Sequence, residues 1–203
     1  MASRRPRLSR DAVLTAALTV IDEAGLEACT MRAVAAELGV EAMSLYWHVP
    51  GKEVLLDGVV EKILEEVAGE LTDVEGWREG MASFAHTLRT VILRHPNAVS
   101  LIAARPLGTY AALGRMAESG MARMEAAGFD RQTTIRAGRT VTRHVLGFTL
   151  AEAALVALGP GPGSGPPPID DVLAQIATDE PGDQFDFGLE VLLDGLEARL
   201  RRA

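Results

Sequence analysis

One stretch decides the fold of this 203-residue chain: MRAVAAELGVEAMSLYWHV, residues 31–49. In its first half, Val34 and Leu38 are four residues apart and give a short helix one apolar face. Gly39 then permits the left-handed backbone of a tight turn, and Leu45 anchors a second short helix on the core. Two short helices joined by a glycine-containing turn predict a helix-turn-helix.

The second short helix presents a face that needs a partner. If Leu45 points inward, the helical rotation of about 100° per residue turns Met43 and Trp47 away from the core. Such side chains have no role at the surface of an isolated domain. In a DNA major groove, apolar groups contact thymine methyls and polar groups reach base edges or phosphates. The DNA contacts predicted here are Ala42, Met43, Ser44, Tyr46, Trp47 and His48.

Three residues outside this helix complete the predicted DNA-contact set. Arg32, in the first turn of the preceding helix, is suited to bidentate reading of a guanine. A solvated arginine or an ion pair with Glu37 is the alternative for Arg32. Lys52, at the start of the next helix, is predicted to contact a phosphate. For Thr30 the main prediction is a helix N-cap, with a phosphate contact as an addition.

The charge of the chain is distributed unevenly. The 20 basic and 28 acidic residues give a net charge of −8, which as a sum argues against nucleic-acid binding. Residues 1–52 carry six of each sign, so the whole −8 falls on residues 53–203. The first ten residues hold four Arg and no acidic residue. The N-terminal part therefore remains compatible with DNA binding.

Composition and motifs exclude several other classes of protein. A hydrophobic fraction of 48% supplies a core and excludes wholesale disorder. The single cysteine, Cys29, excludes an intrachain disulfide framework, and the four His have no metal-ligand spacing, so no metal or other cofactor is predicted. No phosphate-binding loop, dinucleotide fingerprint or nucleophile elbow is present, so the chain is not expected to be an enzyme.

Two rival functions remain open at this point. Cys29 precedes a helix N-terminus and could act as a nucleophile, although a packed and inert cysteine is favoured. A purely structural helical protein is the other alternative, and it leaves the outward face of Met43 and Trp47 unexplained. The Arg-rich N-terminus runs into an amphipathic helix rather than a secretory signal. The uncharged stretch 153–169 is broken by Gly and Pro, so we expect a cytoplasmic protein without membrane spans.

The rest of the chain predicts an all-α fold of about ten helices. Ala, Leu, Glu and Arg dominate, and alternating strand patterns are absent. A helix-turn-helix domain is expected over 1–52, extending into the helix 52–70, with an effector-binding and dimerisation domain over 53–203. Residues 159–168 contain nine Gly or Pro and predict a surface loop, as a connector or as a lid. Helices are expected over about 9–24, 31–38, 42–48, 52–70, 77–94, 95–104, 108–127, 131–158, 169–177 and 184–202.

Two of these helices carry continuous apolar stripes. The stripe of 184–202 runs through Phe185, Leu189, Leu192, Leu196 and Leu200. The stripe of 131–158 runs through Ile135, Val141, Val145, Phe148 and Leu155. Both patterns fit a buried core, and both fit one half of a four-helix dimer interface.

The motif Leu45-Tyr-Trp-His-Val49 after Glu37-Leu-Gly-Val40 resembles the tetracycline-repressor (TetR) family. The resemblance extends to Arg105-Pro106, Gly128-Phe129, Val145–Phe148 and Phe187–Glu190. It implies an all-helical homodimer with a small DNA-binding domain and a larger domain that dimerises and holds an effector. It also implies transcriptional repression at a palindromic operator, which a small-molecule effector relieves.

The sequence departs from the tetracycline-binding members of that family at three positions. Ala68 and Leu101 stand where those members carry His residues that hold the drug and its metal ion. Ala151 matches an acidic position near the metal, with Glu152 one residue further, whereas Arg105 and Pro106 match. Losing the imidazoles removes the nitrogen ligands of a metal-chelated drug. We therefore expect a more apolar effector without metal, and not magnesium–tetracycline.

Eight residues are candidates for effector contacts. Met121 and Phe148 could equally be core residues, and His144 could be a core or interface histidine. Arg105 stands out because a cation beside a proline break is unusual in a core. The candidates are His86, Thr87, Leu101, Arg105, Pro106, Met121, His144 and Phe148.

Overall fold

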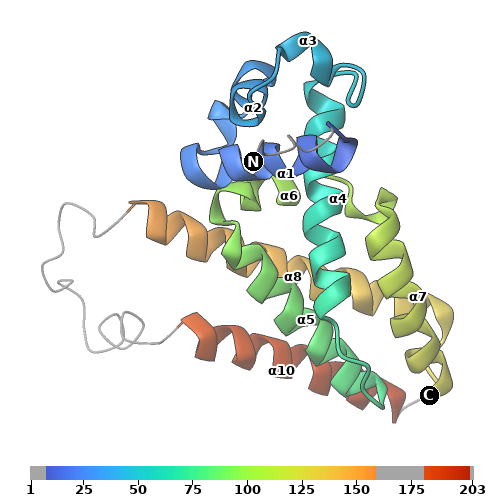
Figure 1. The fold of residues 1–203 in the computed structure, drawn as a ribbon. Helices are drawn as coiled ribbons and strands as arrows, with labels where there is room; N and C mark the ends of the chain where they lie inside the picture. Colours follow the sequence, from blue (N-terminus) through green and yellow to red (C-terminus); the bar gives the residue numbers. More distant parts are fainter. Residues whose placement is uncertain (1–7, 159–180, 202–203) are drawn as a thin grey trace, which may run out of the picture.

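The computed structural model describes residues 8–158 and 181–201. Within them the chain forms nine α-helices, three short 3-10 helices and no strand, which confirms the all-α prediction (Figure 1). The predicted loop over 159–168 and helix over 169–177 lie outside the described residues. The helices are α1 (Arg10–Ala24), α2 (Met31–Leu38), α3 (Ala42–Leu45), α4 (Lys52–Glu70), α5 (Trp77–Arg94), α6 (Val99–Ala103), α7 (Ala111–Ala126), α8 (Arg131–Leu158) and α10 (Pro181–Leu200).

Several element boundaries differ from the predicted ones. The helix expected over 42–48 ends at Leu45, because the N–H groups of His48 and Val49 both turn back to the Leu45 carbonyl at 2.9 Å. The piece expected over 95–104 divides into a 3-10 turn, Pro96–Ala98, and the five-residue α6. A second 3-10 turn, Leu107–Thr109, precedes α7, so that helix begins at Ala111 rather than at 108.

The N-terminal head consists of α1, α2 and α3, and its local geometry follows the sequence closely. The Thr30 hydroxyl accepts a hydrogen bond from the Ala33 N–H at 3.1 Å, which confirms the predicted N-cap of α2. Gly39 has a φ of 64°, so α2 ends in the left-handed conformation that glycine tolerates best. Val34 and Leu45 are fully buried and join the two helices of the motif to the core.

Helix α4 links the head to the rest of the molecule (Figure 1). Gly58 of α4 lies against Leu14 of α1, and a Cβ at position 58 would stand 2.5 Å from a Leu14 methyl carbon. The glycine is therefore needed for the close approach of the two helices. Lys62 adds an ion pair to Asp11 of α1 at 2.9 Å. No helix of the described residues is long and apolar enough to cross a membrane.

The larger C-terminal part packs α5, α7, α8 and α10 around a second section of the core. Helices α8 and α10 pack against each other; α10 crosses the end of the molecule opposite the head, and α8 crosses between α10 and the head (Figure 1). Trp77, at the start of α5, packs its indole edge-on to the Phe129 ring with 5.0 Å between the ring centroids. This contact fixes the turn between α7 and α8 onto α5.

The apolar stripes of α8 and α10 are only partly buried. On α10 the fully buried positions are Phe185, Leu189 and Leu193, while Leu192 is half-buried. Leu196 and Leu200 are also half-buried, so the buried line is rotated relative to the predicted stripe. On α8, Val141 and Val145 are buried but Ile135 is 43% exposed, and the side chain of Leu155 lies outside the described residues.

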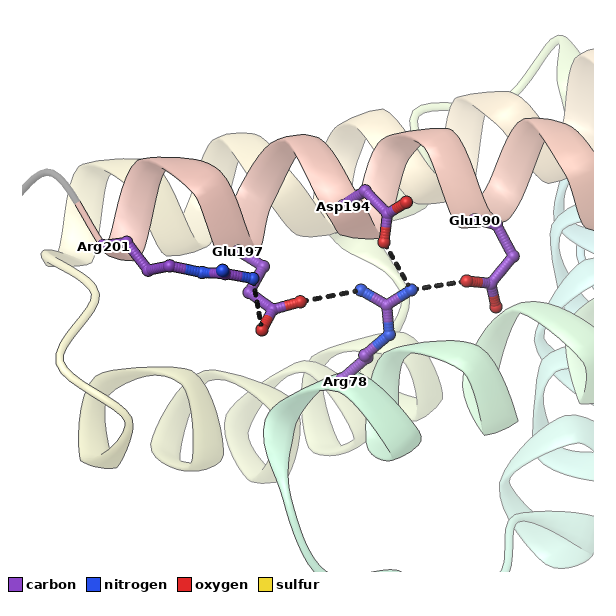
Figure 2. A network of polar contacts seen from close by, with 5 residues as sticks. All are labelled: Arg78, Glu190, Asp194, Glu197 and Arg201. Carbon is purple, nitrogen blue, oxygen red and sulfur yellow. Dashed lines mark hydrogen bonds and ion pairs between the residues drawn. The ribbon is translucent and has the colours of Figure 1, made fainter.

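A network of ion pairs holds the C-terminal half of α10 to the start of α5 (Figure 2). The Arg78 guanidinium of α5 contacts Glu190, Asp194 at 2.8 Å and Glu197 at 3.4 Å. These three carboxylates lie three or four residues apart on one face of α10. Arg201 pairs with Glu197 from its own chain end at 2.9 Å. Arg78 therefore joins α5 to three successive acidic positions of α10.

Candidate functional site

The head presents the outward face that the sequence predicted. Leu45 is fully buried, whereas Trp47 is 89% exposed and Met43 is 72% exposed. Tyr46 flanks them at 45% exposure, and His48 is half-buried. Helix α3 and the turn that follows it thus carry an uncharged, exposed aromatic and thioether surface in the head. Surfaces of this kind mark interaction sites in soluble domains.

Polar and basic side chains surround this face. Arg32 and Lys52 are exposed, and within the described part of the chain Arg32 makes no ion pair, so the alternative pairing with Glu37 does not form. The Ser44 hydroxyl donates to the Glu41 carbonyl at 2.6 Å, which leaves its oxygen free to accept but not to donate. Ala42 is half-buried beside it. The geometry therefore suits contacts to base edges by Arg32 and to a phosphate by Lys52.

Three of the eight effector candidates come together around Phe185, which the sequence indicated only as part of the apolar stripe of residues 184–202. The rings of His144, Phe148 and His86 have their centroids 5.1, 5.6 and 5.7 Å from that of Phe185. His144 stacks on the Phe185 ring, and its Nε2 lies 3.3 Å from the Phe185 carbonyl. We call these four residues the Phe185 cluster. It joins α5, α8 and α10.

A charged pair lies beside the Phe185 cluster. Arg89 donates to Glu152 through Nε at 3.1 Å and through Nη2 at 2.5 Å, and both side chains are more than four-fifths buried. The Arg89 guanidinium also lies 4.9 Å from the centroid of the Phe185 ring. Sequence reasoning missed Arg89 and Phe185. The spacing of His86 and Arg89 on one face of α5 was the signal that could have found the first.

The other five effector candidates lie elsewhere. Leu101 is buried on α6, Thr87 on α5 and Met121 on α7 are half-buried, and Pro106 is exposed. Arg105 is held on α4, with Nη2 donating to Glu53 at 2.8 Å and Nε 3.3 Å from Asp57. The hydrogen bond to Glu53 raises the pKa of Arg105 further above its ordinary value. The sequence therefore grouped residues that belong to at least two separate places.

Two further features bear on the chemistry of the molecule. Cys29 is fully buried, with Sγ 3.9 Å from the Ala17 carbonyl, and burial raises the pKa of its thiol. Such a thiol is a packing residue rather than an activated nucleophile. No group of three or more His, Cys, Asp or Glu that could hold a metal occurs among residues 8–158 and 181–201. A surface depression of about 300 Å³ lies between α1 and α4, and none of the effector candidates lines it.

Comparison with known proteins gives matches over nearly the whole chain. Residues 13–59 match the family described as "Bacterial regulatory proteins, tetR family", and residues 71–200 match "Tetracyclin repressor-like, C-terminal domain". The chain is 36% identical to an HTH-type transcriptional regulator of Saccharopolyspora erythraea over 149 residues, which are 73% of this chain and 63% of that relative.

Solved structures resemble the whole fold. BioQ bound to its natural double-stranded DNA operator is 30% identical, with a TM-score of 0.71 over 94% of this chain and 98% of that one. A single-site variant of TetR from Acinetobacter baumannii AYE, in complex with minocycline, is 29% identical. Its TM-score is 0.79 over 97% of this chain and 96% of that one. The likeness therefore includes both the head and the helices around the Phe185 cluster.

Proposed function

The chain belongs to the tetracycline-repressor (TetR) family of bacterial regulators, and we propose that it is a homodimeric repressor released from a palindromic operator by a small-molecule effector. It is a DNA-binding transcriptional regulator and not an enzyme. The observation that carries the proposal is the outward face of Met43 and Trp47, flanked by Arg32 and Lys52. Its operator lies in the cytoplasm, and we place the protein there.

Exposed apolar residues on α8 and α10 support the homodimer. Phe187 is 73% exposed and Val191 is 55% exposed, and the two lie one helical turn apart on α10. Leu150 and Ile135 of α8 are at least 40% exposed. A second copy of the chain that packs α8 and α10 against these residues would bury them in a four-helix interface. The two heads of such a dimer require an operator with two-fold symmetry and half-sites about 34–36 Å apart or a multiple of it.

This arrangement gives the two parts of the chain different roles. Residues 1–52, extending into α4, form the DNA-binding domain, and residues 53–203 form the domain for effector binding and dimerisation. We place the effector near the Phe185 cluster, where aromatic rings and a buried Arg–Glu pair suit a small, rather apolar molecule that carries a few polar groups. Ala68, Leu101 and Ala151 offer no ligand for a metal, which argues against magnesium–tetracycline.

Selection of bound genomic fragments tests the regulator directly. The purified chain is incubated with sheared genomic DNA, and the retained fragments are sequenced and then measured one by one in a gel shift. We expect a palindromic site upstream of a small set of genes, with affinity that falls steeply with salt because phosphate contacts release counterions. The proposal is wrong if no fragment gives a salt-sensitive shift.

Two substitutions in the head separate base reading from phosphate binding. Arg32→Ala should relax the preference at one base position, because it removes a bidentate contact worth about 1–3 kcal/mol. Lys52→Ala should weaken binding to all DNA sequences by a similar factor, because a phosphate contact carries no sequence information. A selected-site profile that Arg32→Ala leaves unchanged would remove Arg32 from the base-reading set.

Thermal unfolding tests the effector assignment. A ligand that binds only the native state raises the melting temperature by mass action. Tetracycline with magnesium should leave the melting temperature unchanged, whereas a small aromatic ligand found by screening for release of the selected operator should raise it. A clear rise with magnesium–tetracycline would contradict the assignment.

A further inference from the structure

Three acidic residues form a stripe on the side of α4 that faces the segment after α6. Glu53, Asp57 and Glu61 follow one another at four-residue spacing, so they share one face of the helix. Arg105 contacts the first two, donating to Glu53 at 2.8 Å and approaching Asp57 to 3.3 Å. The segment 105–112 thus meets α4 along its first three turns.

Two further donors complete the contact. The Tyr110 hydroxyl donates to Asp57 at 3.2 Å, and the backbone N–H of Ala112 donates to Glu61 at 3.0 Å. Tyr110 is the N-cap residue of α7 but gives it no side-chain cap, so Glu61 caps that helix from α4. We call the contacts of Arg105, Tyr110 and Ala112 with the acidic stripe the α4 clasp.

In the clasp, the donor Arg105 is more buried than the carboxylates that it contacts. The Arg105 side chain is only 22% exposed, although those of Glu53 and Asp57 are 74% and 50% exposed. Burial, with a contribution from Asp57, raises the pKa of Tyr110 to about 12. The hydroxyl therefore keeps its proton, and donates it, at any pH at which DNA binding is measured.

The neighbouring face of α4 contacts the head. Gly58, next to Asp57 in sequence, packs against Leu14 of α1, and Lys62 pairs with Asp11. Lys52, a predicted phosphate contact, immediately precedes Glu53. Helix α4 therefore contacts the head with one face and the clasp with the adjacent face, and the clasp holds the end of α4 that carries Lys52.

We propose that Arg105 is a positioning residue for the DNA-binding head, acting through the α4 clasp, and not an effector contact. The proposal rests on the proposed function, because it assumes that the head binds an operator. Fixing the first turns of α4 limits the orientations that each head samples. Two heads must engage one operator together, so this limitation lowers the entropy lost on binding.

Substitution of Glu53 gives the sharpest test, because two mechanisms predict opposite signs. If Glu53 acts only through its charge beside Lys52, Glu53→Gln removes a repulsion from DNA and strengthens binding. If Glu53 acts through the clasp, the same variant weakens binding. We expect Glu53→Gln and Arg105→Gln each to weaken binding about tenfold. The probe is a labelled operator fragment selected by the unmodified chain, and the readout is fluorescence anisotropy at fixed salt.

The variant that carries both Glu53→Gln and Arg105→Gln, together with a matched control, completes a double-mutant cycle. The double variant should bind no more weakly than Arg105→Gln alone, since that variant already lacks the contact with Glu53. Arg94→Gln is the control, because Arg94 pairs with Glu70 at the other end of α4. We expect that variant to bind the fragment as the unmodified chain does.

Hydrogen exchange tests the clasp without DNA. In Arg105→Gln, the amides of residues 53–60 should exchange faster, while Arg94→Gln should leave them unchanged. The clasp is overturned if exchange there is unaffected, or if Glu53→Gln binds the operator as tightly as the unmodified chain or more tightly. An unmodified chain that selects no DNA would instead overturn the proposed function, and exchange would still decide whether the clasp holds α4.

Discussion

At the scale of single residues, the direction of some side chains could be predicted from the sequence, whereas the contacts of others could not. The outward direction of Met43 and Trp47 follows from a single anchor, Leu45, and from the rotation of a helix, both of which are local. The Phe185 cluster draws its members from α5, α8 and α10, so its existence depends on how three helices pack. No local pattern encodes that packing, so the sequence placed Phe185 in an apolar stripe and not among the effector candidates.

Arg105 is a second residue whose contacts could not be predicted from the sequence. Its place next to Pro106 marked it as unusual, and the structure confirms that it has specific partners. The partners, however, lie about fifty residues earlier on α4. Sequence reasoning therefore identified the residue as special but could not name the acidic stripe that it serves.

A methyl group at position 58 should disturb the junction between the head and α4. In Gly58→Ala the new Cβ would stand 2.5 Å from Leu14, and Leu14 is too buried to move freely, so we expect a loss of about 1–3 kcal/mol in the free energy of unfolding. Gly69→Ala is the matched control on the same helix, where nothing lies within 4 Å. It should be neutral or stabilise by up to about 1 kcal/mol. Urea unfolding measures both, and equal effects would refute the close approach.

Tyr110 should make stability fall in alkali. Its pKa in the folded chain is about 12 against 10.0 for an unperturbed tyrosine, so the unfolded chain loses this proton first. The contribution to stability is therefore fully present below about pH 10 and is lost as the pH rises toward about 12. Urea unfolding from pH 8 to 11 should show a shallower decline for Tyr110→Phe than for the unmodified chain.

A control variant shows whether the difference in pH dependence comes from Tyr110. Tyr46→Phe, in which an exposed hydroxyl is removed, should keep the decline of the unmodified chain and also leaves Tyr110 as the one remaining tyrosine for an absorbance titration. The raised pKa of Cys29 also makes stability fall as the pH rises, but Cys29 is present in all three proteins and contributes equally to each. Identical declines in all three would show that Tyr110 titrates alike in the folded and unfolded chains.

At the scale of the element, the lengths of the helices were more predictable than the direction of their faces. Helix α2 begins and ends where its cap and its glycine place it. Helix α10 carries the expected apolar residues, yet its buried line passes through Leu193. The Arg78 network explains the difference, because it rotates the acidic face of α10 toward α5. The three carboxylates recur at helical spacing, but the sequence does not show which distant cation they face.

The network should stabilise the docking of α10 in a salt-dependent way. Arg78→Gln leaves three carboxylates together without a cation, and we expect a loss of about 1 kcal/mol in unfolding free energy at low salt. About 1 M sodium chloride should reduce the difference to less than half, because exposed carboxylates are screened. Arg131→Gln, which removes an exposed pair to Glu125 at 3.5 Å, should change little at either salt concentration. A salt-independent loss for Arg78→Gln would point to packing instead.

At the scale of the whole molecule, the charge distribution matches the proposed roles. The net charge of −8 belongs to residues 53–203, while the surface of the reading helix α3 and its last turn is uncharged. In the proposed dimer, the affinity for DNA depends on few phosphate contacts per head and on the pairing of two heads. The acidic C-terminal part is repelled by DNA, which favours approach by the head.

A charge at the exposed apolar face of α10 should dissociate the proposed dimer. Phe187→Asp places a carboxylate in the interface, where an unpaired charge is costly to bury. We expect a monomer by light scattering, together with a large loss of operator affinity. Met43→Ser, on the head, should remain dimeric and lose affinity for DNA alone. If Phe187→Asp keeps the mass of the unmodified dimer, the interface lies elsewhere.

The two tryptophans stand at opposite ends of the molecule and in opposite environments. Trp47 is almost fully exposed in the head, on the face proposed to contact DNA, whereas Trp77 is packed edge-on to Phe129 at the start of α5. The chain therefore carries two built-in fluorophores: emission from the first responds to contact with a duplex, and emission from the second responds to loosening of the core. Replacing Trp77 by Phe leaves a single indole whose spectrum follows operator binding and release in real time, without an attached dye.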